Sequence, residues 1–179
     1  LGYLAKLNLE KSLNNVMHTL TPKFLLRYSP GEMRQETDGD RLNPISAFTL
    51  DRLNNINSFE TGLSSTFGFD YKINKDKRNL NFSVAQIINE KENKKMHSKT
   101  SLDEKLSDLV GAVDYELNDN INLKYNFAID QNYKDLNYNE LGTTLKFNKI
   151  NIDFNYLQEK KHIGDQEYFK TKINLGDNE

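Results

Sequence analysis

Apolar and polar residues alternate along several long stretches of this sequence, and this period of two constrains the fold more than any other feature. Residues 62–73 and 150–156 alternate in this way, and residues 121–129 give the clearest case. There the even positions are Asn, Lys, Asn and Ala, whereas the odd positions are all apolar: Ile121, Leu123, Tyr125, Phe127 and Ile129. Successive side chains of a strand point to opposite faces, so each stretch predicts a strand with one apolar and one polar face.

The alternation predicts an all-β fold, an antiparallel up-and-down meander of about nine strands. The expected strands are residues 2–12, 21–29, 59–73, 80–89, 108–117, 121–131, 138–147, 150–158 and 167–175. A further short piece at 45–50 is expected to pair inside the connection that follows Tyr28. The stretch Ser101 to Glu104 fits a capping box, so a helical turn and a strand entrance are both open there.

The connections are of two kinds, which alternate along the chain. Short turns rich in Asn and Asp are expected at 148–149, 118–120 and 74–79. The residues that flank a hairpin turn lie on one face, and the expected pairs are apolar in each case: Phe147 with Ile150, Leu117 with Ile121, and Ile73 with Leu80. The other connections, 30–58, 89–107, 131–137 and 159–166, are longer and carry most of the charge.

This asymmetry of connections is typical of outer-membrane β-barrels, which have short turns at one end and long loops at the other. Several expected strands run about 9 to 15 residues, long enough to span a bilayer and longer than the average of about 5–6. Residues 1–179 are therefore expected to form part of a large transmembrane barrel, as an internal piece of a longer polypeptide. Two alternatives stay open: a porin-like or small structural outer-membrane barrel, and a soluble β-sandwich that binds glycans.

Composition excludes several function classes. The net charge of −2 carries no basic excess of the kind that nucleic-acid binding requires. Because the chain has no Cys, it has no disulfide, thiol nucleophile or cysteine-type zinc site. The sequence has no catalytic motif, so we expect neither enzymatic activity nor a cofactor.

Three stretches resemble the lipopolysaccharide-assembly protein LptD family. Leu20 to Pro30 resembles the strand that precedes a large external loop of that family. Phe48 to Asn54, followed by Glu60 to Gly62, resembles its F-x-x-D-R-x-N … E-x-G stretch, and Phe82 to Ile88 resembles the next hairpin. The resemblance is clearest over residues 20–90, whereas residues 108–175 agree mainly in hairpin pattern.

The resemblance implies location in the bacterial outer membrane, in contact with its lipid, and transport of lipopolysaccharide into the outer leaflet. It also implies two partners, a plug lipoprotein of the LptE type inside the barrel and a periplasmic bridge protein of the LptA type. The family's N-terminal jelly roll and the barrel ends that form its lateral opening are not expected within residues 1–179. The family's structural cysteines are absent from this chain.

Polar residues in the expected strands are the candidate functional residues. Those expected to line the barrel interior are Asp70, Lys72, Lys124, Asn126, Lys146 and Asp153. Asp51 and Arg52 fall in the family-like stretch; they are expected to form a solvated salt bridge, to order the external loop or to provide a polar contact on the substrate path. His18, His97 and His162 are expected at exposed positions, and Asp38 to Asp40 in a turn, so no metal site is predicted.

Overall fold

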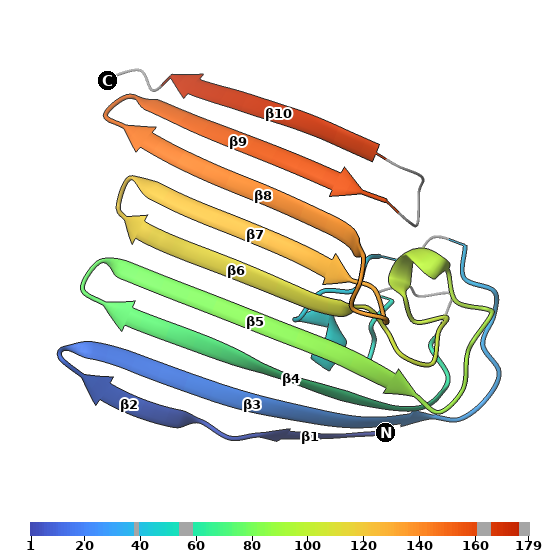
Figure 1. The fold of residues 1–179 in the computed structure, drawn as a ribbon. Helices are drawn as coiled ribbons and strands as arrows, with labels where there is room; N and C mark the ends of the chain where they lie inside the picture. Colours follow the sequence, from blue (N-terminus) through green and yellow to red (C-terminus); the bar gives the residue numbers. More distant parts are fainter. Residues whose placement is uncertain (38–39, 54–58, 161–165, 176–179) are drawn as a thin grey trace.

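Ten strands form one antiparallel sheet in the computed structural model of the protein, which describes residues 1–37, 40–53, 59–160 and 166–175 (Figure 1). Each strand from β3 onward pairs with the next strand in the chain, so the sheet is a meander, as the alternation predicted. The strands are β1 (Gly2–Lys6), β2 (Leu9–Leu13), β3 (Val16–Ser29), β4 (Gly62–Lys75), β5 (Arg78–Asn89), β6 (Leu109–Asn118), β7 (Ile121–Ile129), β8 (Leu136–Phe147), β9 (Ile150–Glu159) and β10 (Gln166–Leu175).

The strand expected at 2–12 is two strands, β1 and β2, which both pair with β3. The break lies at Leu7 and Asn8, opposite Pro22, whose carbonyl accepts a hydrogen bond from the Leu7 N–H at 3.2 Å. In each hydrogen-bonded pair of an antiparallel ladder, the two residues exchange two N–H···O hydrogen bonds. Proline can accept one of these bonds but has no N–H to donate the other. Pro22 therefore interrupts the ladder on the side of β1 and β2.

The hairpin turns are tighter than predicted. Lys75 pairs with Arg78, so the turn expected at 74–79 contains only two residues, although the predicted pairing of Ile73 with Leu80 is confirmed. Phe147 pairs with Ile150, also as predicted. The expected pairing of Leu117 with Ile121 is wrong: Asn118 pairs with Ile121, next to an irregularity in the ladder.

A further turn joins β2 to β3, which begins at Val16 rather than at residue 21. Its two residues, Asn14 and Asn15, have φ of 49° and 60°. A two-residue hairpin with positive φ at both positions matches the right-handed twist of the strands, and asparagine tolerates that backbone better than most residues.

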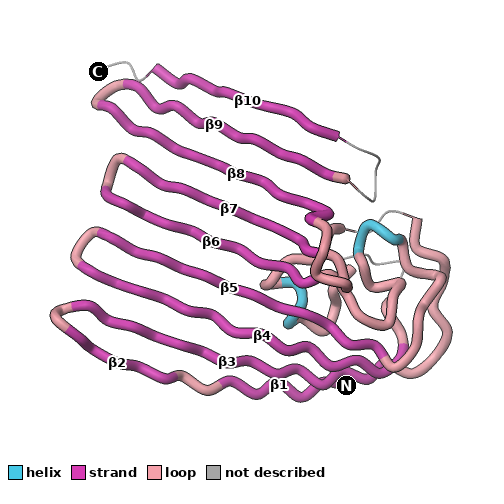
Figure 2. The backbone as a smooth tube through the Cα atoms, viewed as in Figure 1, coloured by secondary structure: helices cyan, strands magenta, loops and turns pink. Residues whose placement is uncertain are grey.

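The connections contain two short 3₁₀ turns, η1 (Ser46–Phe48) and η2 (Ser98–Thr100), drawn in cyan in Figure 2. The strand piece expected at 45–50 is therefore wrong. Residues 101–104 form neither a helical turn nor a strand entrance; Leu106 forms an isolated bridge with Ile88, and β6 begins at Leu109. No helix in the described part of the chain is long and apolar enough to cross a membrane.

The sheet has two faces of different character. The register places Phe69, Phe82 and Phe127 on one side, with aromatic pairs such as Phe69–Phe82 at 5.7 Å between ring centroids; we call this side the apolar face. Asp70 and Lys124 lie on the other side, the polar face. The described strands form one sheet rather than two packed sheets, which does not fit the β-sandwich alternative.

The buried core lies between the polar face and the two long connections, residues 30–61 and 90–108. These connections gather at one end of the sheet, the loop end, whereas the two-residue turns lie at the opposite turn end (Figure 1). The core therefore joins side chains from β5, β6 and β7 to side chains from the connections: Ala85, Ile87, Val110 and Ala128 with Met33, Leu42, Ala47, Leu53, Met96 and Leu102. The sheet itself stays open, with β1–β2 at one edge and β10 at the other.

Candidate functional site

The six strand residues singled out as interior-facing lie on the polar face. The register places Lys124 between Asp114 and Gly142, and Asn126 between Ala112 and Glu140. The remaining members follow from the same ladder: Asp70 opposite Ser83, Lys72 opposite Asn81, Lys146 opposite Asn151, and Asp153 opposite Thr144. The alternation alone was sufficient to group these residues, because a shared face depends only on register.

Lys124 and Asp153 form cross-strand contacts toward the turn end. The Lys124 Nζ lies 3.8 Å from an Asp114 carboxylate oxygen, with side chains 62% and 41% exposed. The Thr144 hydroxyl donates to Asp153 at 2.9 Å. Contacts of this kind in water contribute about 1 kcal/mol or less each, so this region is a hydrated polar surface rather than a rigid network.

Asp70 differs because it lies at the border of the covered region. The Lys23 ammonium donates to its carboxylate at 2.8 Å, and the Lys23 side chain is only 11% exposed. The same ammonium lies 4.4 Å from the centre of the Phe48 ring, in cation–π geometry. Lys23 thus links the sheet to η1 in the first connection.

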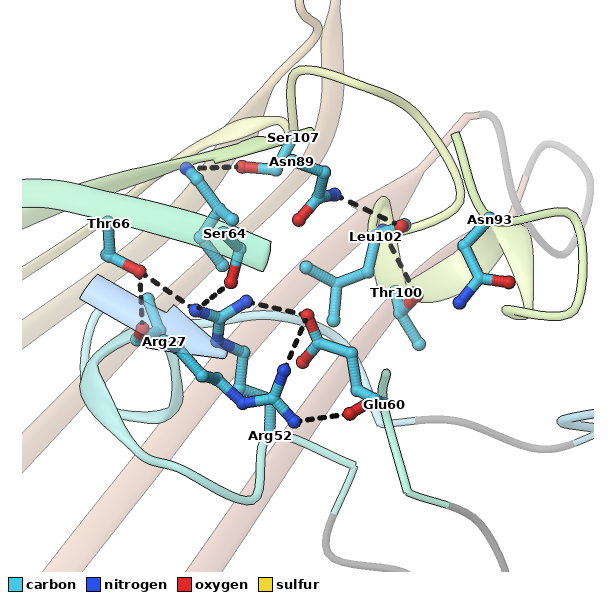
Figure 3. Close-up of polar contacts among 12 residues, drawn as sticks. Arg27, Arg52, Glu60, Ser64, Thr66, Asn89, Asn93, Thr100, Leu102 and Ser107 are labelled. Atoms are coloured by element: carbon cyan, nitrogen blue, oxygen red, sulfur yellow. Dashed lines mark hydrogen bonds and ion pairs between the residues drawn. The ribbon is translucent and has the colours of Figure 1, made fainter. Parts of the chain in front are cut away.

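Arg52 is the centre of a buried polar cluster at the loop end (Figure 3). Its guanidinium donates to the Glu60 carboxylate at 2.8 Å, and to the hydroxyls of Ser64 and Thr66 at 3.1 Å each. Its side chain is fully buried. Because Ser64 and Thr66 belong to β4, these bonds tie the first connection to the polar face.

A second arginine, Arg27 of β3, approaches the same carboxylate. Its Nη1 lies 3.5 Å from the Glu60 Oε1, and both side chains are 6% exposed. Arg27 also donates through Nε to the Leu50 carbonyl at 2.8 Å. Two arginines therefore share one glutamate, and one of them also holds the backbone of the first connection.

The charges of this cluster affect the pKa of Arg52 in opposite directions. Burial lowers the pKa of the Arg52 guanidinium, while Glu60 raises it and the neighbouring Arg27 lowers it. A buried pair of this kind is tolerated only when its geometry and hydrogen bonds are good. Both Nη atoms of Arg52 are hydrogen-bonded, whereas Arg52 Nε, Arg27 Nη1 and Glu60 Oε2 are buried without a hydrogen-bond partner among the described residues. Removing one partner would leave an uncompensated charge.

Sequence reasoning selected Arg52 but gave it the wrong partner. Asp51 is exposed, and Arg52 is buried and paired with Glu60, so the solvated Asp51–Arg52 salt bridge is wrong. Arg27 and Glu60 were not singled out, although both lie in the family-like stretches. Glu60 is separated by eight residues from Arg52, and no periodicity connects the two positions.

Small residues on the polar face allow the first connection to approach the sheet. A Cβ at Gly68 would lie 2.1 Å from the Val84 carbonyl oxygen and 3.1 Å from the Phe48 ring. A Cβ at Gly2 would meet the Leu50 side chain. Glycine at these two positions therefore makes room for the segment from Phe48 to Leu50.

The second connection is anchored by side chains near the end of β5. The Asn89 amide donates to the carbonyls of Leu102 and Glu104, at 3.3 and 2.9 Å. The Ser107 hydroxyl accepts from the Ile87 N–H at 2.9 Å. These bonds, drawn in part in Figure 3, satisfy backbone groups that the sheet leaves unpaired as it ends.

The histidines and acidic turn offer no shared site in the described residues. His18 lies in β3, and both His18 and His97 are partly buried, so their expected exposure is wrong. The His18 Nδ1 is 2.8 Å from the Tyr71 hydroxyl. His97 caps η2, accepting from the Lys99 N–H at 3.1 Å. His162, Asp38 and Gly39 lie outside the described residues. No group of three or more metal-ligating side chains is found in the part of the chain that the structure describes.

A comparison with protein families places this chain in a family. The family model described as "LptD: LPS transport system D" matches residues 2–176, nearly the whole chain. No curated protein shows a significant similarity to the sequence.

Proposed function

The chain belongs to the LptD family of LPS transport proteins, and from this premise we propose that its sheet is a section of the wall of a large outer-membrane β-barrel. In this proposal residues 1–179 form part of the barrel that inserts lipopolysaccharide into the outer leaflet. The polar face lines the interior and the apolar face contacts lipid. The observation that carries the proposal is the separation of the two faces over the meander, with Lys124 and Phe127 only three residues apart on β7.

Two unpaired edges also favour a larger closed structure. An open sheet exposes backbone donors and acceptors along β1–β2 and β10, and hydrocarbon leaves such groups without partners. Further strands at both edges would satisfy them. Closure then requires more strands than the ten that the sheet contains.

The exposed part of the polar face is the surface we assign to interior contacts. It offers charges of both signs and amides, which suit hydrogen bonding to a plug lipoprotein of the LptE type or to lipopolysaccharide head groups. The residues concerned are Asp70, Lys72, Lys124, Asn126, Lys146 and Asp153. Delivery by a bridge protein of the LptA type belongs to the same proposal, without an assigned residue. Transport makes and breaks no covalent bond in this chain, so no residue receives a catalytic role.

Arg52 receives a separate role, the ordering of the external loop. Its bonds to Glu60, Ser64 and Thr66 hold the segment around Arg52 against the polar face. Asp51 is exposed next to it and makes no comparable set of bonds in the described residues. We therefore assign the ordering role to Arg52 with Glu60, and no role to Asp51.

A pair of adjacent lysine substitutions in the full-length protein tests the barrel. Phe127→Lys places a charge on the proposed lipid face, where it costs about 2–4 kcal/mol near the bilayer midplane, and should sharply reduce the folded barrel and surface lipopolysaccharide. Asn126→Lys is the matched control for folding, because it faces the interior and should preserve the folded barrel. Heat-modifiable mobility and surface labelling of lipopolysaccharide measure the two effects. Equal tolerance of the two variants would contradict the proposal.

Site-specific photocrosslinking tests the interior assignment. A photoreactive residue at Lys124 in the full-length protein should crosslink to the plug lipoprotein or to lipopolysaccharide, whereas one at Phe127 should crosslink to neither protein nor sugar. Crosslinks to the plug from Phe127, with none from Lys124, would invert the assignment of faces.

A further inference from the structure

Residues 41–52 of the first connection cross the polar face from β9 to β3, and we call this segment the strap. At its first end the Arg41 guanidinium forms an ion pair with Glu159 of β9 and lies 4.2 Å from the centre of the Tyr138 ring of β8, in cation–π geometry. The side chains of Arg41 and Glu159 are only 16% and 6% exposed. This end of the strap is therefore attached to two strands by a largely desolvated contact.

The middle of the strap packs on the strands between its two ends. Leu42 belongs to the buried core, together with Val110 of β6 and Ala128 of β7. The 3₁₀ turn η1 contacts β5, and the Thr66 hydroxyl of β4 donates to the Ala47 carbonyl at 3.0 Å. The strap therefore lies against the sheet along its length.

The last residues of the strap are attached to the opposite side of the sheet. The Leu50 carbonyl accepts from Arg27 of β3 at 2.8 Å, and the Leu50 side chain occupies the space that Gly2 of β1 leaves. Arg52, which is fully buried, ends the strap with its bonds to β4. The strap thus contacts β1 and each strand from β3 to β9.

The strap has little slack between its attached ends. At about 4.8 Å for each strand spacing, β3 and β9 lie about 29 Å apart along the sheet. An extended chain from residue 41 to residue 52 reaches about 40 Å at most, and η1 shortens that reach because a 3₁₀ turn rises only about 2 Å per residue. The separation of β3 and β9 is therefore limited as long as both ends hold.

A ladder of hydrogen bonds alone does not fix the curvature of a sheet, since the twist between neighbouring strands varies from about 10° to 35°. Toward the turn end, contacts such as that of Lys124 with Asp114 connect neighbouring strands. The strap, in contrast, connects β9 with β3 and β1. It therefore constrains the sheet as a whole.

We propose that the strap is a tie that holds β1 and β3–β9 at one curvature, so that this section of the wall moves as a single body. A change in the width of the barrel interior then takes place in strands outside this section. The inference rests on the proposed function, because an interior exists only in a closed barrel, and it adds which part of the wall stays fixed.

Distances between two spin labels in the full-length protein test the tie. Labels attached to cysteines at Ser65 of β4 and Gln158 of β9 lie on the apolar face, away from the strap, about 24 Å apart along the sheet. Arg41→Ala frees one end of the strap and should broaden the distance distribution about twofold. Asp114→Ala, on the polar face but outside the strap, should leave it unchanged. Tyr138→Leu removes only the cation–π contact and serves as a second variant if Arg41→Ala fails to show heat-modifiable folding.

A chemical lock tests whether this section stays fixed during transport. Ile45 of the strap and Ala112 of β6 line one cavity of about 330 Å³, and neither residue has an assigned role. Ile45→Cys combined with Ala112→Cys, joined by a short bismaleimide, fastens the strap to the sheet. Surface lipopolysaccharide should stay at the level of the unlinked protein.

The outcomes separate the inference from the proposed function. An unchanged distance distribution in both Arg41→Ala and Tyr138→Leu would overturn the tie. Loss of surface lipopolysaccharide on locking, absent from the single-cysteine variants treated alike, would show that the strap moves and would overturn the fixed section. Either result leaves the barrel standing, because the barrel is tested by Phe127→Lys against Asn126→Lys. Equal tolerance of those two variants would contradict the proposed function, while broadening by Arg41→Ala would still support the tie within the sheet.

Discussion

The two halves of the polar face share one sheet and one register, yet one half is a buried core and the other is a wet surface. In the loop-end half, Thr66, Ala85 and Ile87 are fully buried beneath the connections. In the turn-end half, Lys124 is 62% exposed, and the ion pair that it forms is loose. We call these the covered half and the open half.

The difference shows that side-chain size, as well as polarity, determines which half is covered. Gly68, Ala85 and Ala128 leave room above the sheet, and the segment around Phe48 fills it. Serine and threonine in the covered half serve as hydrogen-bond acceptors for Arg52 instead of facing water. In the open half, longer side chains stand in the way of such docking and are solvated.

Removing the central cation of the covered half should have the largest effect. Arg52→Ala leaves the Glu60 carboxylate buried without its closest partner, and we expect a loss of about 3–5 kcal/mol in the stability of the docked connection. Lys124→Ala in the open half should cost about 1 kcal/mol or less. The rate of protease cleavage within residues 40–53, measured in the folded full-length barrel, reports both. Arg52→Lys should be intermediate, because it keeps the charge but loses the planar fork.

A glycine in each half provides a second contrast. Gly68→Ala places a Cβ 2.1 Å from a backbone oxygen, which cannot move aside easily, so we expect a loss of about 1–3 kcal/mol. Gly142→Ala in the open half meets only the Asn155 side chain at 3.0 Å, which can rotate away, and should cost well under about 1 kcal/mol. Urea unfolding of the barrel in detergent measures both. Equal midpoints would show that the backbone of β4 and β5 relaxes at Gly68 and Val84 to accept a Cβ.

Exchanging the charges of one exposed pair should have almost no effect. Asp114→Lys combined with Lys124→Asp preserves the ion pair at 3.8 Å in the open half, and we expect a change within about 0.5 kcal/mol. The equivalent exchange of Arg52 and Glu60 in the covered half should fail, since a reversed pair would no longer reach Ser64, Thr66 and Arg27. Urea unfolding of each double variant in detergent checks the contrast.

The two ends of the sheet should lose local order at opposite extremes of pH, with the smallest effects of this series. At the loop end, hydrogen bonds lower the pKa of the Asp130 carboxyl, and the largest contribution comes from the Lys134 backbone N–H. The ionised Asp130 therefore stabilises the folded loop above the usual pKa of aspartate, and this stabilisation is lost as the pH falls through the lowered pKa. At the turn end, the hydrogen bond to Asp119 raises the pKa of Lys77, so that contact persists below the usual lysine range and is lost as pH rises through the raised value. Amide exchange in residues 130–135 and 76–77 measures the two responses, and Asp130→Asn should abolish the acid response.

The sheet was largely predictable because its information is local. Alternation and turn residues located every strand except the division at Leu7 and the early start of β3, and they grouped Lys124 with Asp153 on one face. The division depends on Pro22, which lies in a different strand from the break, and so on a pairing that the sequence does not display.

The covered half was not predictable, because its contacts join segments that no period connects. Ser64, Thr66 and Gly68 alternate with apolar residues and therefore indicated a solvent-exposed polar face. Small polar residues are equally compatible with solvent and with contact to a docked loop. The signal that marks burial is the pair Ala85 and Ile87, apolar residues on the polar side of β5. Arg52 was identified as unusual, but its partner Glu60 could be recognised only in the fold.

The long connection between Ser29 and Gly62 has a consequence for the order of folding. Turns such as that between Phe147 and Ile150 close over two residues, whereas pairing β3 with β4 first requires a loop of about thirty residues to close, at an extra entropic cost of about 2 kcal/mol. The local hairpins β2–β3, β4–β5, β6–β7 and β8–β9 should therefore form first, and the pairing of β3 with β4 should form later. The ion pairs of Arg27 and Arg52 with Glu60 then stabilise the late pairing of β3 with β4 against reopening.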